Sequence, residues 1–241
     1  MKIISFTTIP SRINKIESVI KSLCNQSMMA DEIILWIPEY YTRLKSSIDS
    51  YPKFLNNYPV QIKHCKHDYG PFTKLRPSLD YCSEDDIIVT CDDDIIYPDK
   101  WFENLVNFSY SHPDYAIGYR GRKFINRNTL DYNKSKLIFG NFSQDFERID
   151  IITGTRGALY KKRFFTDYIY SEEHKDMFFV DDIWINGNLA KAGTTRIVIP
   201  DPGFPEKETL DLELYSIDSL YEFNEDGKNN NHGINVFKEY F

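Results

Sequence analysis

One segment of this 241-residue chain carries most of the structural information: Ile87-Ile88-Val89-Thr90-Cys91-Asp92-Asp93-Asp94-Ile95-Ile96-Tyr97-Pro98. An unbroken apolar run of this length, rich in β-branched residues, is typical of a strand that is buried on both faces of a sheet. The run changes abruptly into three aspartates, and Pro98 ends the extended segment just beyond them. The segment therefore predicts a buried strand whose carboxyl end presents acidic side chains.

The residues before this strand alternate between strand and helix patterns. Short apolar runs predict strands at residues 2–8, 32–37 and 60–64. One helix face is predicted by the spacing of Ile16, Val19, Ile20 and Leu23. A second helix is expected around Tyr41, Leu44 and Ile48. This alternation predicts an α/β fold with a parallel sheet, in which ligands bind beyond the carboxyl ends of the strands.

The pattern is looser after residue 100. It predicts helices at residues 101–106 and 183–190, and strands at residues 115–119, 149–153 and 195–199. After Pro200 the chain is polar, and residues 229–233 indicate a turn in an irregular tail. No internal repeat or clear boundary divides the chain, so we expect one domain over residues 1–241.

Composition excludes some classes of protein. The formal net charge of −7 argues against nucleic acid as a partner, because binding to phosphate backbones requires a basic face. The four cysteines show no C-x-x-C spacing, which argues against a zinc site and fits a reducing compartment. The chain shows no signal-peptide pattern and no apolar run of roughly 20 residues, so we expect a cytoplasmic protein without a transmembrane segment.

The aspartate run (residues 92–94) indicates a metal site. Crowded carboxylates raise one another's pKa unless a cation relieves the repulsion, and a hard divalent ion such as Mn²⁺ or Mg²⁺ does so. Asp92 and Asp94 share one side of an extended segment, so both can face one ion, while Asp93 points elsewhere, toward a ribose or a backbone amide. The alternative is an acidic turn leading into a helix at Asp99.

Residues 87–98 resemble the strand and D-x-D motif of GT-A glycosyltransferases, close to the family 2 type. The resemblance implies a Rossmann-like, mostly parallel central sheet flanked by helices, with Mn²⁺ or Mg²⁺ holding the diphosphate of a nucleotide sugar. It makes Asp94 the main metal ligand and places Asp92 on the ribose or the metal. It also implies a nucleotide-sugar-binding half over residues 1–98 and an acceptor-side half over residues 99–241.

Two segments match the donor-binding parts of this family. Residues 7–12 follow the first strand at the place where family members bind the nucleotide. Thr8 and Arg12 are therefore donor-binding candidates, and Arg12 could pair with a phosphate or stack on the base. In residues 68–77, Lys74 and Arg76 bring positive charge to the diphosphate. Asp68 can accept a hydrogen bond from a uracil N–H. The alternative for residues 68–77 is a solvated loop.

Two further segments match the acceptor side. Residues 153–158 resemble the small-residue segment between donor and acceptor, in which Gly154 allows close approach to a ligand. Residues 180–184 resemble the E-D motif, whose aspartate is the general base in inverting members. Asp182 matches that position, with Asp181 as the alternative and helix capping as a structural explanation. His232 resembles the late histidine that many GT-A enzymes supply to the metal or the diphosphate. The alternative is a solvated side chain.

The resemblance implies transfer of one sugar from a nucleotide sugar, by default a UDP-sugar, to a hydroxyl of a glycan, protein or small molecule. We favour inversion because a candidate base is present, and retention is the alternative because retaining GT-A enzymes carry similar motifs. The Q-x-x-R-W signature of processive synthases is absent. Ile37-Pro38-Glu39 stands where an acid that binds the base is expected, which leaves the nucleotide open. Two alternatives are a nucleotidyltransferase, which usually has a glycine-rich loop that residues 7–12 lack, and a non-catalytic carbohydrate- or nucleotide-binding module.

Overall fold

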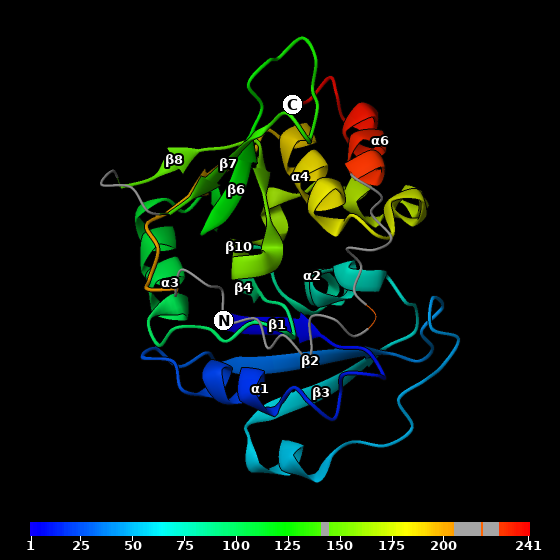
Figure 1. The fold of residues 1–241 in the computed structure, drawn as a ribbon. Helices are drawn as coiled ribbons and strands as arrows, with labels where there is room; N and C mark the ends of the chain where they lie inside the picture. The colour runs from blue at the N-terminus through cyan, green and yellow to red at the C-terminus, as the bar shows by residue number, and fades with distance from the viewer. Residues whose placement is uncertain (141–144, 205–217, 219–226) are drawn as a thin grey trace.

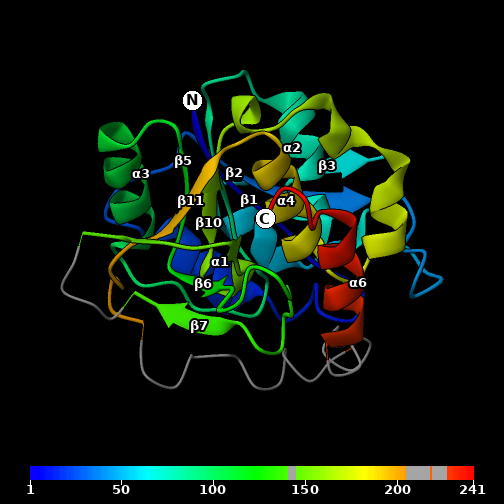
Figure 2. The same cartoon turned by 90° about the horizontal axis from the view of Figure 1, so that it is seen from above.

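A computed structural model of the chain describes residues 1–140, 145–204, 218 and 227–241. The strands of its main sheet are β1 (Lys2–Thr7), β2 (Glu32–Pro38), β3 (Val60–Cys65), β4 (Ile87–Thr90), β5 (Tyr115–Gly118), β8 (Glu147–Arg148), β10 (Ala158–Tyr160) and β11 (Thr195–Val198). Within these residues the strand order is β3-β2-β1-β4-β10-β5-β11-β8 (Figures 1 and 2). The first four strands are parallel, whereas β10 runs antiparallel to both of its neighbours.

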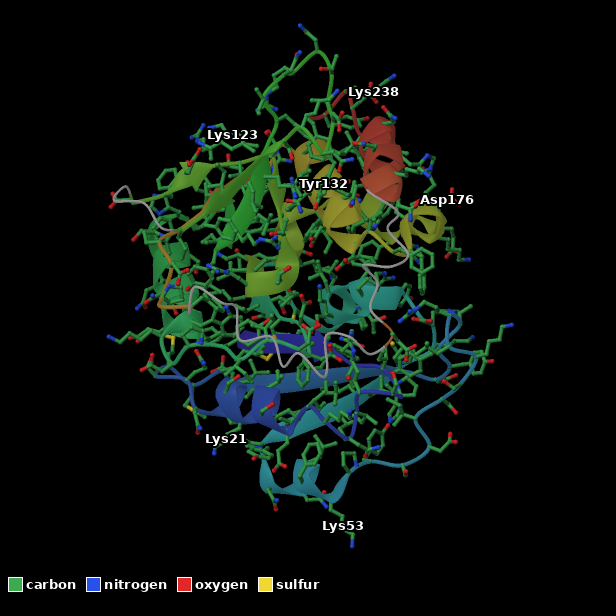
Figure 3. All side chains as sticks on the ribbon, in the orientation of Figure 1. Lys21, Lys53, Lys123, Tyr132, Asp176 and Lys238 are labelled. Atoms are coloured by element: carbon green, nitrogen blue, oxygen red, sulfur yellow. The ribbon has the colours of Figure 1, made fainter. Side chains whose placement is uncertain are left out.

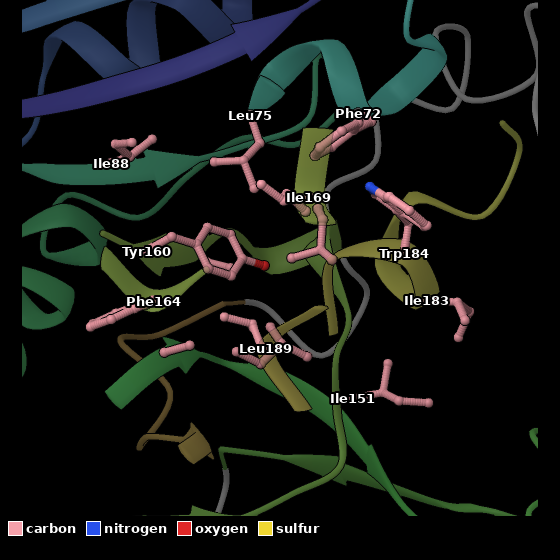
Figure 4. Packing of buried hydrophobic residues seen from close by; sticks show 14 of the residues in the cluster. Phe72, Leu75, Ile88, Ile151, Tyr160, Phe164, Ile169, Ile183, Trp184 and Leu189 are labelled. Atoms are coloured by element: carbon pink, nitrogen blue, oxygen red, sulfur yellow. The ribbon is translucent and has the colours of Figure 1, made fainter. Parts of the chain in front are cut away.

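Helices cover both faces of this sheet. They are α1 (Glu17–Cys24), α2 (Arg76–Tyr81), α3 (Trp101–Ser111), α4 (Asp181–Lys191) and α6 (Lys228–Val236), with short 3₁₀ turns η1 (Lys53–Asn57), η2 (Gly70–Lys74), η3 (Gly154–Arg156), η4 (Lys162–Phe164), η5 (Asp167–Tyr170) and η6 (Glu172–Met177). Alternate residues of a strand face opposite sides. Ile4 of β1 therefore packs in the cluster with α1 and α3, and Ile3 packs in the cluster with α2 and α4. Figure 4 shows the second cluster, in which Ile88, Tyr160 and Trp184 lie around the sheet.

The register of the central strands brings two chain segments to one edge. Ser5 of β1 is opposite Thr90 of β4, and the backbone N–H of Cys91 donates to the carbonyl of Ser5. Because the two strands are parallel, the residues that follow β1 and those that follow β4 emerge at the same end. The aspartate run is therefore placed beside Thr8 by strand pairing alone.

A second, smaller antiparallel sheet follows β5. Its strands are β6 (Arg120–Lys123), β7 (Lys136–Phe139) and β9 (Ile151–Ile152), in the order β7-β6-β9. Figure 2 labels β6 and β7 of this sheet. The buried side chain of Asn186, from α4, donates to the carbonyl of Ile152 and accepts from its backbone N–H, both at 2.8 Å. This pair of bonds fixes α4 against β9, so the start of α4 is held at a set place beside the sheet.

The predicted α/β fold with a flanked, mostly parallel sheet is confirmed, and the structure forms a single domain. The predicted strand at residues 149–153 is shorter than expected: only Ile151–Ile152 form a strand, β9, which joins the small sheet, while β8 precedes it and joins the main sheet. The helix predicted around Tyr41 is wrong. There Tyr41 and Ser46 form an isolated bridge and Lys45 has a positive φ of 50°. The hydroxyl of Tyr41 turns inward to donate to the carbonyl of Thr8, so the apolar spacing reflects one buried ring.

The prediction of an irregular tail is wrong for residues 228–236, which form α6 beside α4 in both views (Figures 1 and 2). Residues 205–217 and 219–226 of the predicted tail lie outside the described residues. Asparagine and glycine are weak helix formers, so local preference does not predict this helix. Tertiary packing stabilises it: Ile234 and Phe237 are buried, and Gly233 lies against Ile183. None of the helices in the described ranges combines the length and apolar character needed to cross a membrane.

The contact between Gly187 and Phe237 gives a test of this packing. A Cβ atom at position 187 would lie 2.1 Å from Cδ2 of Phe237, so the ring would have to move. We expect Gly187→Ala to lower the free energy of unfolding by about 1–3 kcal/mol, although alanine is the better helix former. In a Phe237→Ala background the same change should stabilise, because the ring is gone. Urea unfolding of the four variants measures both effects, and an equal cost in both backgrounds would contradict the packing.

Candidate active site

The aspartate run lies against the segment that follows β1. Asp93 accepts hydrogen bonds from Thr8 Oγ1 at 2.6 Å and from Arg12 Nη1 at 2.8 Å, and Arg12 also reaches Asp94 Oδ2 at 3.2 Å. Thr8, Arg12 and Asp93 are buried. Charge-assisted hydrogen bonds of this kind are short and directional. Asp93, predicted to point away from a metal, therefore anchors the two donor-binding candidates that follow β1.

Asp94 lies in surroundings that disfavour its charged form. Burial, and then the charges of Asp93 and Asp92, raise the pKa of Asp94 to about 7, although Arg12 and Lys74 act in the opposite direction. Its side chain is only 15% exposed. From the described residues, neither Oδ1 of Asp94 nor Oδ2 of Asp92 accepts a hydrogen bond. Two carboxylates that crowd each other and keep spare oxygen atoms are suited to a hard divalent cation.

The protein side of such a metal site is small. In the ranges that the structure describes, no group of three or more His, Cys, Asp or Glu side chains is arranged to hold a metal ion. Mg²⁺ is typically held by one or two carboxylates and completes its coordination with water and substrate phosphates. The donor set of Asp92 and Asp94 therefore fits a cation that is shared with a bound diphosphate.

Lys74 connects the aspartate run to α4. It ends η2, its side chain is 6% exposed, and its Nζ lies 2.7 Å from Asp92 Oδ1 and 3.0 Å from Asp181 Oδ2. Burial alone would lower the pKa of this amine, but Asp181, Asp92 and Asp182 outweigh burial and hold the pKa well above its usual value. Lys74 is therefore a permanently charged link between the end of β4 and the start of α4.

Asp182 lies on the other side of this link. Its Oδ1 accepts the backbone N–H of Gly154 at 2.9 Å. Burial, and then the charge of Asp181, raise the pKa of Asp182 to about 7, with Lys74 and the Gly154 N–H opposing the rise. A Cβ atom at Gly154 would lie 3.1 Å from both Asp182 Oδ1 and Lys74 Nζ, so this glycine allows the close contact. A carboxylate with this pKa is suited to accept a proton near neutral pH.

Three predicted site residues are not joined to this cluster by any contact in the described part of the chain. Asp68 accepts the backbone N–H groups of Gly70 and Thr42, at 2.8 and 2.7 Å, and so stabilises its own turn. Arg76 forms a salt bridge with Asp80, one helical turn along α2. His232 is an exposed residue of α6. Their predicted roles remain predictions, since local partners account for the first two.

Sequence reasoning missed four residues around the cluster. The hydroxyl of Tyr97 accepts the backbone N–H of Asp92 at 2.8 Å, which fixes the start of the aspartate run. Burial, and then the charge of Asp182, raise the pKa of Tyr132, which Figure 3 labels. The guanidinium of Arg122 lies 4.2 Å from the centroid of the Tyr132 ring, and Nη1 of Arg120 donates to Thr155 Oγ1, next to Gly154. The available signal was the Arg-Gly-Arg alternation at residues 120–122, which puts both arginines on one face of a strand.

The buried link gives a prediction about stability. Lys74→Met would leave Asp92 and Asp181 without their counter-ion, and breaking a buried pair in this way costs about 3–5 kcal/mol. The matched control is Lys134→Met, because Lys134 is 84% exposed and pairs with Asp131 at the surface. We expect that control to change the free energy of unfolding by less than about 0.5 kcal/mol. Urea unfolding at pH 8 compares them, and equal effects would show that Lys74 is not a buried counter-ion.

Comparisons with known proteins place these residues in a family. The sequence model described as Glycosyl transferase family 2 matches residues 10–169, a range that ends before α4. No curated protein matches this sequence. Two of the solved structures that match this chain share little sequence with it. One is S. aureus TarS 1–349 in complex with UDP, at 12% identity and TM-score 0.47, covering 84% of this chain and 58% of that chain.

The other is the mannosyltransferase PcManGT from Pyrobaculum calidifontis in complex with GDP-Man and Mn²⁺, at 14% identity and TM-score 0.47, covering 86% of this chain and 57% of that chain. This chain thus spans little more than half the length of either. The family match covers more than half of this chain and includes Arg12, Lys74, the aspartate run and Gly154. The chain therefore belongs to glycosyl transferase family 2.

Proposed function

We propose that this protein is a metal-dependent glycosyltransferase that moves one sugar from a nucleotide sugar, by default a UDP-sugar, to an acceptor hydroxyl with inversion. The observation that carries the proposal is the buried chain of contacts from Asp92 through Lys74 to Asp181. It brings spare carboxylate oxygens and a candidate base together in a member of this family. These are the two chemical functions that a sugar transfer to a hydroxyl requires.

On the donor side, Asp92 and Asp94 would hold Mn²⁺ or Mg²⁺. The cation, when bound, supplies positive charge to the diphosphate that leaves. Lys74 adds a fixed positive charge beside Asp92, which is the charge that a departing diphosphate needs. Arg12, held by Asp93, adds a second cation at the same edge. The chain therefore supplies a preorganised electrostatic environment for the leaving group.

On the acceptor side, Asp182 would take the proton of the acceptor hydroxyl. The acceptor oxygen forms a bond to the anomeric carbon while the bond from that carbon to the diphosphate oxygen breaks, and one such displacement inverts the anomeric centre. Asp181 is engaged with Lys74, whereas Asp182 is bonded to the Gly154 N–H through only one oxygen. This difference favours Asp182 as the base and gives Asp181 the role of holding Lys74.

The acceptor class and the compartment belong to the same proposal. The acceptor is a glycan, a protein or a small molecule with a free hydroxyl. A cytoplasmic location is supported by Cys24, Cys65, Cys82 and Cys91, all of which are free thiols. Fractionation of the native cells tests the location, and recovery of the protein only outside the cytoplasm would refute it.

Two aspartate variants separate binding from chemistry. Asp182→Asn should lower kcat about 10²- to 10⁴-fold, because an amide cannot accept the proton, with little change in nucleotide affinity. Asp94→Asn should remove the Mn²⁺-dependent part of that affinity. The control is Asp176→Asn, since Asp176 is exposed on η6. Calorimetry and transfer assays with UDP-, GDP- and CDP-sugars, with and without EDTA, measure both effects. Full activity of Asp182→Asn would exclude it as the base.

The pKa of Asp182 gives a pH prediction. The base is active as the carboxylate, and a pKa of about 7 keeps it largely protonated below neutrality. We therefore expect kcat/KM to rise about tenfold per pH unit up to about pH 7 and then to level off. An unshifted aspartate would give a plateau above about pH 5. Steady-state rates measured between pH 5 and 9 distinguish the two, and a flat profile over this range would contradict the assignment.

A further inference from the structure

Two arginines extend from one face of β6 beside the candidate base. Arg120 and Arg122 are two residues apart on the strand and therefore share a face. Both are half-buried, and each guanidinium lies over an aromatic ring: Arg120 over Phe139 at 5.6 Å and Arg122 over Tyr132 at 4.2 Å. Stacking and burial hold long side chains in one place, so the two cationic groups are preorganised.

No acidic side chain in the described ranges neutralises this pair. Neither guanidinium has a carboxylate oxygen within 4.0 Å, although the chain has a net charge of −7. Neighbouring arginines differ: Arg156 pairs with Asp201 at 2.5 Å, and Arg127 pairs with Asp150 at 2.8 Å. Keeping two like charges close together without a counter-ion is unfavourable, and a bound anion would relieve it.

The hydrogen bonds of the pair are also incomplete. Among the described residues, Arg120 donates from Nη1 to Thr155 Oγ1, and Arg122 donates from Nη1 to the carbonyl of Tyr132 and to Ser135 Oγ. The Nε–H groups of both arginines are buried without a partner. A guanidinium has five donors in a fixed fork that suits the oxygen atoms of a phosphate or carboxylate. Because these Nε atoms are buried, the donors that a ligand can reach are the Nη–H groups that those three bonds leave unused among the described residues.

The position of the pair assigns it to the acceptor side of the site. Arg120 bonds Thr155, whose neighbour Gly154 donates to Asp182. The charge of Asp182 also acts on Tyr132, which lies under Arg122. The cations that act most on Asp94 are instead Arg12 and Lys74. The donor edge thus has its own two cations, and the pair on β6 lies beside the base.

We propose that Arg120 and Arg122 bind an anionic group, a phosphate or a carboxylate, that the acceptor carries near its reacting hydroxyl. This inference rests on the proposed function, because the acceptor side is defined by Asp182. It makes the substrate class an anionic sugar or polyol in place of a neutral one. The discrimination has a physical basis, since a neutral acceptor would leave both charges unpaired when it displaces water from them.

The test uses calorimetry on the whole protein saturated with UDP and Mn²⁺, so that the donor edge is filled. The probes are glucose 6-phosphate, glucuronic acid and glucose, which carry a phosphate, a carboxylate and no charge. We expect at least one anionic probe to bind about tenfold or more tightly than glucose. Arg120→Gln or Arg122→Gln should remove that advantage, and Arg122→Lys should remove part of it, since lysine lacks the fork.

Lys123→Gln is the matched control, because Lys123 lies on the opposite face of β6 and pairs with Glu147, so its loss should leave the advantage intact. Three outcomes in the unmodified protein would overturn the inference: equal binding of the three probes, failure of both anions to bind at millimolar concentration, or displacement of the anion by UDP. None of these outcomes depends on a variant that folds poorly. Failure of UDP, GDP and CDP alike to bind in the presence of Mn²⁺ would instead refute the proposed function.

Discussion

The site depends on one buried ammonium group. Lys74 neutralises Asp92 at the end of β4 and Asp181 at the start of α4, and these two elements are distant in the sequence. Buried ion pairs often add little net stability compared with apolar packing, but they allow few alternative arrangements. Lys74 therefore sets the relative position of the two acidic segments more than it stabilises the fold. The close contact at Gly154 completes this arrangement, because the backbone N–H of Gly154 donates to Asp182, the candidate base.

The part of the site that follows from the sequence is the part that strand pairing determines. Residues 87–94 predict a buried strand ending in acids, and parallel pairing with β1 brings Thr8 and Arg12 to Asp93. The roles of Lys74 and Asp182 were expected from resemblance to a family. Their link through Asp181 is a contact between distant segments, which no local pattern specifies. The raised pKa values of Asp94 and Asp182 likewise arise from burial in the folded state.

The predictions that failed relied on local sequence patterns at positions where contacts between distant residues determine the structure. The apolar spacing around Tyr41 matches a helix, but a single inward ring explains it. Residues 229–233 contain weak helix formers, yet packing of Gly233 on α4 makes them helical. Arg120 and Arg122 were missed because β6 is short and polar, and because an arginine is unusual only once the positions of the nearby carboxylates are known. The chain thus has an acidic net charge and also a local pair of arginines, and the net charge does not indicate this pair.

The side chain of Asn186 has a consequence for how this molecule meets others. Strand β9 is an outer strand of the small sheet, and an outer strand usually offers unpaired peptide groups to any passing chain. The amide of Asn186 satisfies both peptide groups of Ile152 and stands where another strand would add. One carboxamide thereby blocks strand addition at this margin, which protects the protein from sheet-mediated self-association there.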